Sequence, residues 1–107
     1  MSLDDEMTIK ELVSTCHDYA KRRGFWEDCP VDSPIIRLAK LMLIVTEISE
    51  AAEAVRHADK DNFAEELADI CIRVFDLAGA YEIDLNAAIA DKMVVNEKRK
   101  RMHGKLA

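Results

Sequence analysis

The sequence predicts an all-α protein with an antiparallel, four-helix bundle-like protomer. Apolar residues recur at helical spacing through most of the 107 residues, and no useful stretch alternates in the manner of a strand. The chain contains only three glycines and two prolines, so the connections between helices must be few and short. Short connections make consecutive helices antiparallel neighbours. We therefore expect a single helical domain over residues 1–107.

The first helix is predicted over residues 9–23. Thr8 and Glu11 stand three residues apart, which is the spacing of a capping box, and apolar residues follow them at helical intervals. Gly24 comes directly after the predicted end, where glycine commonly terminates a helix.

The second helix is predicted over residues 34–58, with Ser33 as its N-cap and Pro34 at its first position. Its stretch 38–45 is apolar almost all round, whereas a helix of an isolated bundle buries a single stripe. Such a helix needs cover on more than one side. We expect a homo-oligomer whose interface is formed largely by the second and third helices. The alternative is a monomer that wraps tightly around this stretch.

The third and fourth helices are predicted over residues 63–80 and 85–102. Residues 59–62 form a short polar turn that can cap the third helix, and Asp84 is a favourable N-cap for the fourth. Gly104 lies just beyond the predicted end of the fourth helix.

Composition excludes several classes of function. The formal net charge of −6 argues against a general nucleic-acid surface, which needs a basic face. No apolar run is long enough to span a bilayer, and the acidic first residues do not resemble a signal peptide. The three cysteines form no C-x-x-C pair, which favours reduced thiols. We expect a cytoplasmic protein that binds neither nucleic-acid polymers nor membranes.

Two pairs of carboxylates are the most informative feature for function. Glu47 and Glu50 lie three residues apart in the second predicted helix, and Glu66 and Asp69 lie three apart in the third. Residues at this spacing share a helix face, and apolar residues flank both pairs. Any one of these carboxylates is most simply a solvated surface group. Two matched pairs on adjacent antiparallel helices instead favour a site for Mg²⁺, which prefers oxygen ligands.

The motif residues resemble a known family. E-I-S-E, followed after fifteen residues by E-L-A-D, is similar to the E-x-x-E…E-x-x-D pattern of the MazG-like all-α nucleotide pyrophosphohydrolases. The third-helix context E-E-L-A-D-I-C-I and the later segment I-D-L-N-A-A-I-A-D-K-M-V-V-N-E-K-R are also similar to that family. The resemblance covers roughly residues 35–101.

The resemblance implies hydrolysis of ribo- or deoxyribonucleoside triphosphates to the monophosphate and pyrophosphate, with housecleaning of non-standard nucleotides as one role. It implies Mg²⁺ as the cofactor, with Mn²⁺ as a substitute, and dimers or tetramers as assemblies. By motif position the metal ligands are Glu47, Glu50, Glu66 and Asp69. We expect Glu50 also to act as the general base that accepts a proton from the attacking water.

The same resemblance places Lys92 and Asn96 beside the metal and the phosphates, with Lys92 counted as catalytic, and adds Arg99 as a substrate-binding residue. These three positions share one face of the fourth helix. Trp26 and His17 are candidates to bind the base, because aromatic faces stack on bases. The alternative for Trp26 is a loop aromatic that closes one end of the bundle.

Two other functions stay open at this point. One is a phosphoribosyl-ATP pyrophosphohydrolase-like activity, which would use the same carboxylates. The other is a non-catalytic helical interaction module whose acidic patch binds a metal ion or nothing.

Overall fold

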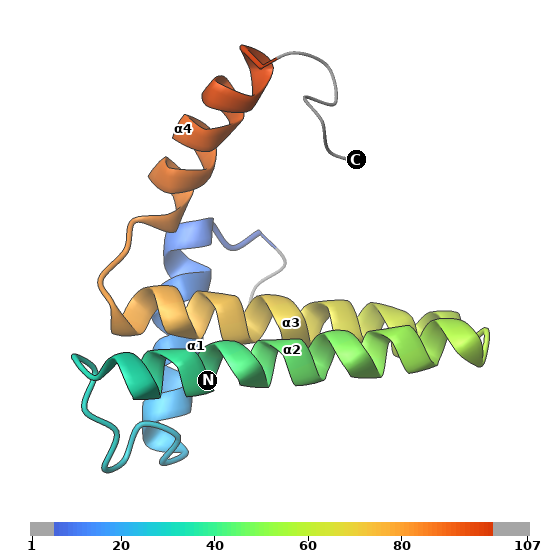
Figure 1. Ribbon diagram of the computed structural model, residues 1–107, viewed down its shortest axis with the longest axis horizontal. Coiled ribbons are helices and arrows are strands. Elements are labelled where there is room, and N and C mark those ends of the chain that lie inside the picture. Colours follow the sequence, from blue (N-terminus) through green and yellow to red (C-terminus); the bar gives the residue numbers. More distant parts are fainter. Residues whose placement is uncertain (1–5, 100–107) are drawn as a thin grey trace.

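A computed structural model describes residues 6–99 and shows four helices, α1 (Ile9–Arg22), α2 (Pro34–Arg56), α3 (Lys60–Ala80) and α4 (Leu85–Glu97). The long helices α2 and α3 lie side by side, α1 packs across α3, and α4 contacts α1 (Figure 1). Between residues 6 and 99 there is no strand. The predicted all-α fold class with four helices is therefore confirmed.

Every helix begins at a side-chain cap. Thr8 and Glu11 form the predicted capping box, in which Thr8 Oγ1 accepts a hydrogen bond from the Glu11 amide at 3.1 Å and Glu11 Oε1 accepts one from the Thr8 amide at 3.1 Å. The N-caps of the other three helices are Ser33, Asp59 and Asp84.

Helices α1 and α2 end one and two residues before their predicted ends, and the larger differences from the predicted bounds are at the start of α3 and the end of α4. Asp59 Oδ1 accepts a hydrogen bond from the Asn62 amide at 3.1 Å, so α3 starts at Lys60 and the polar turn predicted at 59–62 is mostly helix. The fourth helix ends at Glu97 instead of Met102, because the backbone turns at Lys98. The predicted Gly104 terminus lies outside the described residues.

The first three helices end in the same backbone motif, with a left-handed residue after the C-cap. This residue is Gly24 (φ 83°) after α1, Ala58 (φ 53°) after α2 and Glu82 (φ 53°) after α3. In each case the amide of the next residue donates back to an alanine carbonyl inside the helix, at 2.9–3.0 Å. A left-handed conformation costs a residue with a side chain about 1–2 kcal/mol. Two of these three helix ends therefore carry strain.

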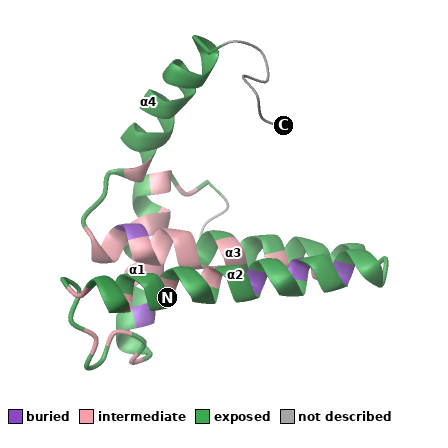
Figure 2. Ribbon diagram, viewed as in Figure 1, coloured by how far each residue is buried: buried purple, intermediate pink, exposed green. Residues whose placement is uncertain are grey.

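Small residues make up the buried core of the described protomer. The buried apolar residues between positions 6 and 99 are all alanines (Figure 2): Ala20, Ala51, Ala54 and Ala78. Gly79 adds to this pattern, because a Cβ atom at that position would lie 2.6 Å from the Cβ of His17 on α1. Helices α1 and α3 therefore approach more closely than a larger residue at position 79 would allow.

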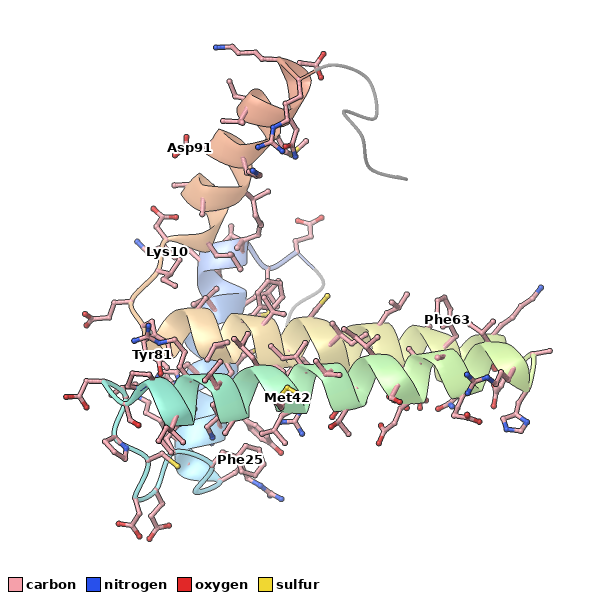
Figure 3. The ribbon with its side chains drawn as sticks, viewed as in Figure 1. Lys10, Phe25, Met42, Phe63, Tyr81 and Asp91 are labelled. Atoms are coloured by element: carbon pink, nitrogen blue, oxygen red, sulfur yellow. The ribbon has the colours of Figure 1, made fainter. Side chains whose placement is uncertain are left out.

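Large apolar side chains lie mostly outside this core. On α2, Leu38 is 62% exposed and Met42 60% exposed, and on α4 Met93 is 66% exposed. Helix α4 contains no buried residue, and its side chains project on all sides, Asp91 among them (Figure 3). The predicted homo-oligomer, with its interface on the second and third helices, stays a prediction; of the faces just described, the one on α2 belongs to that interface. None of the helices described between residues 6 and 99 has the length and apolarity that a bilayer crossing requires.

Replacing Ala58 by glycine should stabilise the protein by roughly 0.5–1 kcal/mol, because relief of the left-handed strain exceeds the added backbone entropy. The control is Ala64→Gly on the exposed side of α3, which should lose about 1 kcal/mol because its backbone is helical. Urea unfolding followed by circular dichroism measures both changes. Destabilisation by both variants would contradict this account of the α2 terminus.

Candidate metal centre

The carboxylates of Glu47, Glu66 and Asp69 converge between α2 and α3. One oxygen from each of the three residues lies within 4.8 Å of the others. Opposite ligands of an octahedral Mg²⁺ are about 4.2 Å apart, so a small adjustment of the side chains would bring these oxygens to one ion. The structure thus brings together three of the four predicted metal ligands.

The seam between α2 and α3 explains how a carboxylate comes to be buried. The buried residues of α2 are Glu47, Ala51 and Ala54, which recur at intervals of four and three and share one helix face. The alanines let the two helices approach, and Glu47 lies on the same stripe with only 9% of its surface exposed. On α3, Glu66 and Asp69 are one turn apart and meet this stripe.

The Glu66 carboxylate is enclosed without a group, among the described residues, that compensates its charge. Its Oε2 atom is enclosed and has no hydrogen-bond partner in the described part of the chain. Burial raises the pKa of the Glu66 carboxyl above its ordinary value, and the charges of Glu50, Asp69 and Glu47 raise it further. A divalent cation would supply the missing partner and remove the repulsion, so this donor set fits Mg²⁺.

Glu50, the fourth predicted ligand, is not in the converging group. It is exposed, but its charge is the largest contribution to the raised pKa of Glu66 after burial. Glu50 therefore lies beside the cluster and open to solvent.

Arg73 contacts the cluster and was not among the predicted site residues. Its Nε donates to Glu47 Oε1 at 2.9 Å. It follows Asp69 by four residues on α3, so the spacing Glu66, Asp69, Arg73 already placed a cation on the acidic face. That spacing was the available signal in the sequence.

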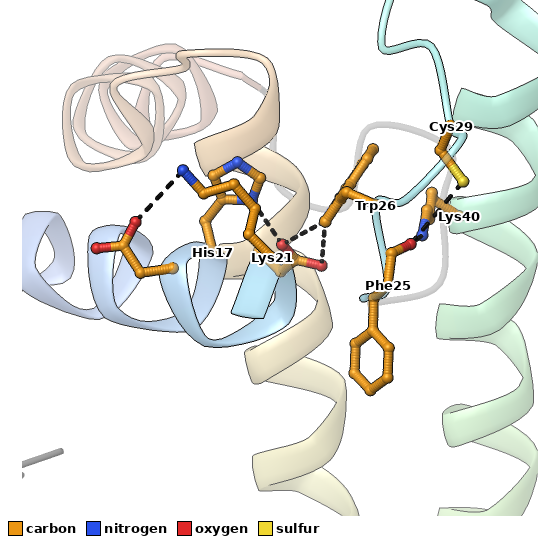
Figure 4. Close-up of polar contacts among 8 residues, drawn as sticks. His17, Lys21, Phe25, Trp26, Cys29 and Lys40 are labelled. Atoms are coloured by element: carbon orange, nitrogen blue, oxygen red, sulfur yellow. Dashed lines mark hydrogen bonds and ion pairs between the residues drawn. The ribbon is translucent and has the colours of Figure 1, made fainter. Parts of the chain in front are cut away.

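His17 and Trp26 meet at a second polar group, around Asp76 of α3 (Figure 4). Trp26 Nε1 donates to Asp76 Oδ1 at 2.9 Å, and His17 Nδ1 lies 2.8 Å from the same oxygen. The ionised carboxylate only accepts, so Nδ1 of His17 carries the proton. The two rings are edge to face, and Lys40 Nζ lies 4.2 Å from the centre of the Trp26 ring. Sequence reasoning paired neither aromatic residue with Asp76.

A cavity of about 270 Å³ is lined by one residue from each of the two polar groups. Arg73, which holds Glu47, and Asp76, which holds Trp26, both line it. The remaining lining residues are Phe25, Lys40, Leu43 and Leu77. The cavity is slightly smaller than a typical pocket for a drug-sized ligand, so it suits part of a nucleotide.

The residues predicted on the fourth helix lie elsewhere in this protomer. Lys92 and Asn96 are exposed on α4, and Arg99 is exposed just after it. Helix α4 contacts α1 and points away from the α2–α3 pair (Figure 1). A single protomer thus does not bring Lys92 and Asn96 to the carboxylates, and their roles stay predictions.

Comparison with known protein families identifies the family of this chain. Residues 38–103, more than half of the chain, match the MazG nucleotide pyrophosphohydrolase domain. The match begins in α2, spans the carboxylates of α2 and α3, and extends beyond α4. No curated protein matches the chain at a significant level.

Glu66→Gln should raise the melting temperature of the metal-free protein at about pH 7. The pKa of Glu66 is raised in the folded state. Its protonated form therefore contributes favourably to the free energy of unfolding at acid pH, and this contribution is lost as the pH rises through that pKa. Glutamine is neutral at every pH, as protonated Glu66 is at acid pH. The difference in melting temperature between Glu66→Gln and the wild-type protein should therefore shrink toward acid pH. Thermal unfolding in a chelator at several pH values measures this, with the exposed neighbour variant Glu65→Gln as the control. An equal or lower melting temperature for Glu66→Gln at about pH 7 would show that the ionised Glu66 carboxylate does not destabilise the fold.

Proposed function

This chain belongs to the MazG nucleotide pyrophosphohydrolase domain family, and on that premise we propose that it cleaves nucleoside triphosphates to the monophosphate and pyrophosphate with Mg²⁺. The observation that carries the proposal is the convergence of Glu47, Glu66 and Asp69, with one enclosed oxygen of Glu66 left without a partner. A structural acidic patch would not enclose an unpaired carboxylate oxygen between two helices, because that arrangement is costly.

The carboxylates divide into two roles in this proposal. Glu47, Glu66 and Asp69 would hold Mg²⁺, with Glu50 completing the set from the solvent side. Bound Mg²⁺ neutralises phosphate charge and lowers the pKa of a coordinated water. Glu50 is exposed beside Glu66, so it is also the carboxylate best placed to take a proton from water that enters from solvent.

The nucleoside end of the substrate would lie toward Trp26 and His17. Asp76 holds both side chains, and it lies two helical turns beyond Asp69 on the same helix, about 10 Å along the axis. That separation suits a ligand whose phosphates sit at the acidic cluster and whose base reaches the aromatic residues. The cavity lined by Arg73 and Asp76 would take the part of the ligand next to the aromatic residues.

A second copy of the chain would complete the site. The alanine core leaves the apolar faces of α2 and α4 uncovered, which favours burial of those faces in a homo-oligomer. Lys92 on α4 is positively charged and the cluster on α2 and α3 is negative, so the two surfaces are complementary. We propose that α4 of one protomer brings Lys92 and Asn96, and Arg99 just after it, to the carboxylates of its partner.

Asp69→Asn should lower the rate of pyrophosphate release by at least about 100-fold, because it removes a charged ligand from the metal site. The assay uses a panel of ribo- and deoxyribonucleoside triphosphates and phosphoribosyl-ATP with Mg²⁺, and chromatography identifies the monophosphate and pyrophosphate. Glu65→Gln is the matched control and should keep wild-type activity. Turnover of phosphoribosyl-ATP alone would support the related activity, whereas no turnover of any nucleotide by the wild-type protein would refute the proposed function.

Mixing two inactive variants should restore activity if the site is shared between protomers. Lys92→Ala and Asp69→Asn should each be inactive alone, but co-expressed chains should recover roughly a quarter of wild-type activity in a two-fold dimer. Light scattering on the same sample reports the assembly. Stable mixed oligomers without recovered activity would contradict the contribution of α4 across the interface.

A further inference from the structure

Arg73 occupies the boundary between the acidic cluster and the cavity. Its Nε atom donates to Glu47 Oε1 at 2.9 Å, and its side chain also lines the cavity of about 270 Å³. The Glu47 side chain is 12% exposed, while that of Arg73 is 36% exposed. The guanidinium is therefore held at Nε by a mostly buried partner, while the Arg73 side chain stays partly open to solvent.

Most of the donor capacity of Arg73 is unused. A guanidinium carries five N–H donors in a planar fork, and the contact with Glu47 uses the one on Nε. The four donors on the terminal nitrogens have no partner within residues 6–99. Planar paired donors of this kind match the oxygens of a phosphate group in two parallel hydrogen bonds.

The order of charges along α3 places these donors where a phosphate chain would pass. Glu66 and Asp69 come first, Arg73 follows one turn later, and Asp76 follows at the next turn. Lys40 of α2 lines the same cavity and adds a second cation. Along α3, Arg73 thus lies between the carboxylates of Asp69 and Asp76.

We propose that Arg73 is a substrate-binding residue whose terminal nitrogens hold a phosphate group of the nucleotide while its Nε keeps Glu47 in place. The inference rests on the proposed function and adds a specific anion-binding group to it. The contact with Glu47 fixes the fork before the substrate arrives, which reduces the entropy lost on binding. The alternative is that Arg73 only balances the charge of Glu47.

The test compares Arg73→Gln with Arg73→Lys, using Arg56→Gln as the matched control because Arg56 pairs with Glu53 on the exposed surface. Calorimetry measures binding of a nucleoside triphosphate with a non-hydrolysable α–β bridge and binding of the monophosphate, both with saturating Mg²⁺. Electron paramagnetic resonance measures Mn²⁺ affinity without nucleotide. Circular dichroism confirms folding.

Arg73→Gln should weaken binding of the triphosphate analogue about 10- to 100-fold, the usual range for hydrogen bonds to a charged group. Its Mn²⁺ affinity should change less than about threefold, because removal of a nearby positive charge offsets the loss of support for Glu47. Arg73→Lys should show a smaller loss of analogue affinity, since lysine keeps the charge without the fork. If Arg73→Gln does not fold, the affinity of Arg73→Lys for the analogue provides the test.

Two results would overturn the inference. One is unchanged affinity for the triphosphate analogue in the folded variants. The other is a loss of Mn²⁺ affinity that accounts for the whole loss of nucleotide affinity, because Arg73 would then act through Glu47 alone. Neither result would contradict the proposed function. That proposal fails only if the wild-type protein turns over no nucleotide.

Discussion

Close packing through small residues is the constraint on which the rest of this structure depends. Ala51 and Ala54 line the face of α2 that meets α3, and Gly79 lets α1 cross α3 with no room for a Cβ atom. Helices that meet through alanine and glycine bring their backbones near each other, and whatever else lies on the same stripe becomes enclosed. On α2 the third member of the buried stripe is Glu47, so close packing itself carries a carboxylate into the seam.

The enclosed carboxylates then set the electrostatics. Burial in the seam raises the pKa of Glu66, and the like charges gathered around it raise that pKa further. The chain meets the charge of Glu47 with Arg73 but leaves an enclosed oxygen of Glu66 without a donor. A metal-binding site needs this imbalance, because carboxylates that were satisfied internally would gain nothing from a metal ion.

The same packing leaves large apolar side chains exposed on other faces of the helices. An alanine core removes little apolar surface from water, and the larger side chains of α2 and α4 remain on the outside. The proposed oligomer would link stability to function, since the partner proposed to cover those faces is also the proposed source of Lys92 and Asn96. The sharp turns between packed helices also carry backbone strain, because Ala58 and Glu82 adopt left-handed conformations there.

Features that depend on neighbours a few residues apart could be predicted from the sequence. Thr8, Ser33, Asp59 and Asp84 cap helices because a cap needs only the next turn, and the carboxylate pairs share faces because helical spacing requires it. The pairing of groups far apart in the chain depends instead on how the helices pack. Arg73 meets Glu47 across 26 residues of sequence, and Asp76 meets Trp26 across 50. The packing of the helices also decides that α4 turns toward α1, away from the carboxylates. Such pairings depend on how closely and at what angle helices cross, and that is set by packing across the whole protomer.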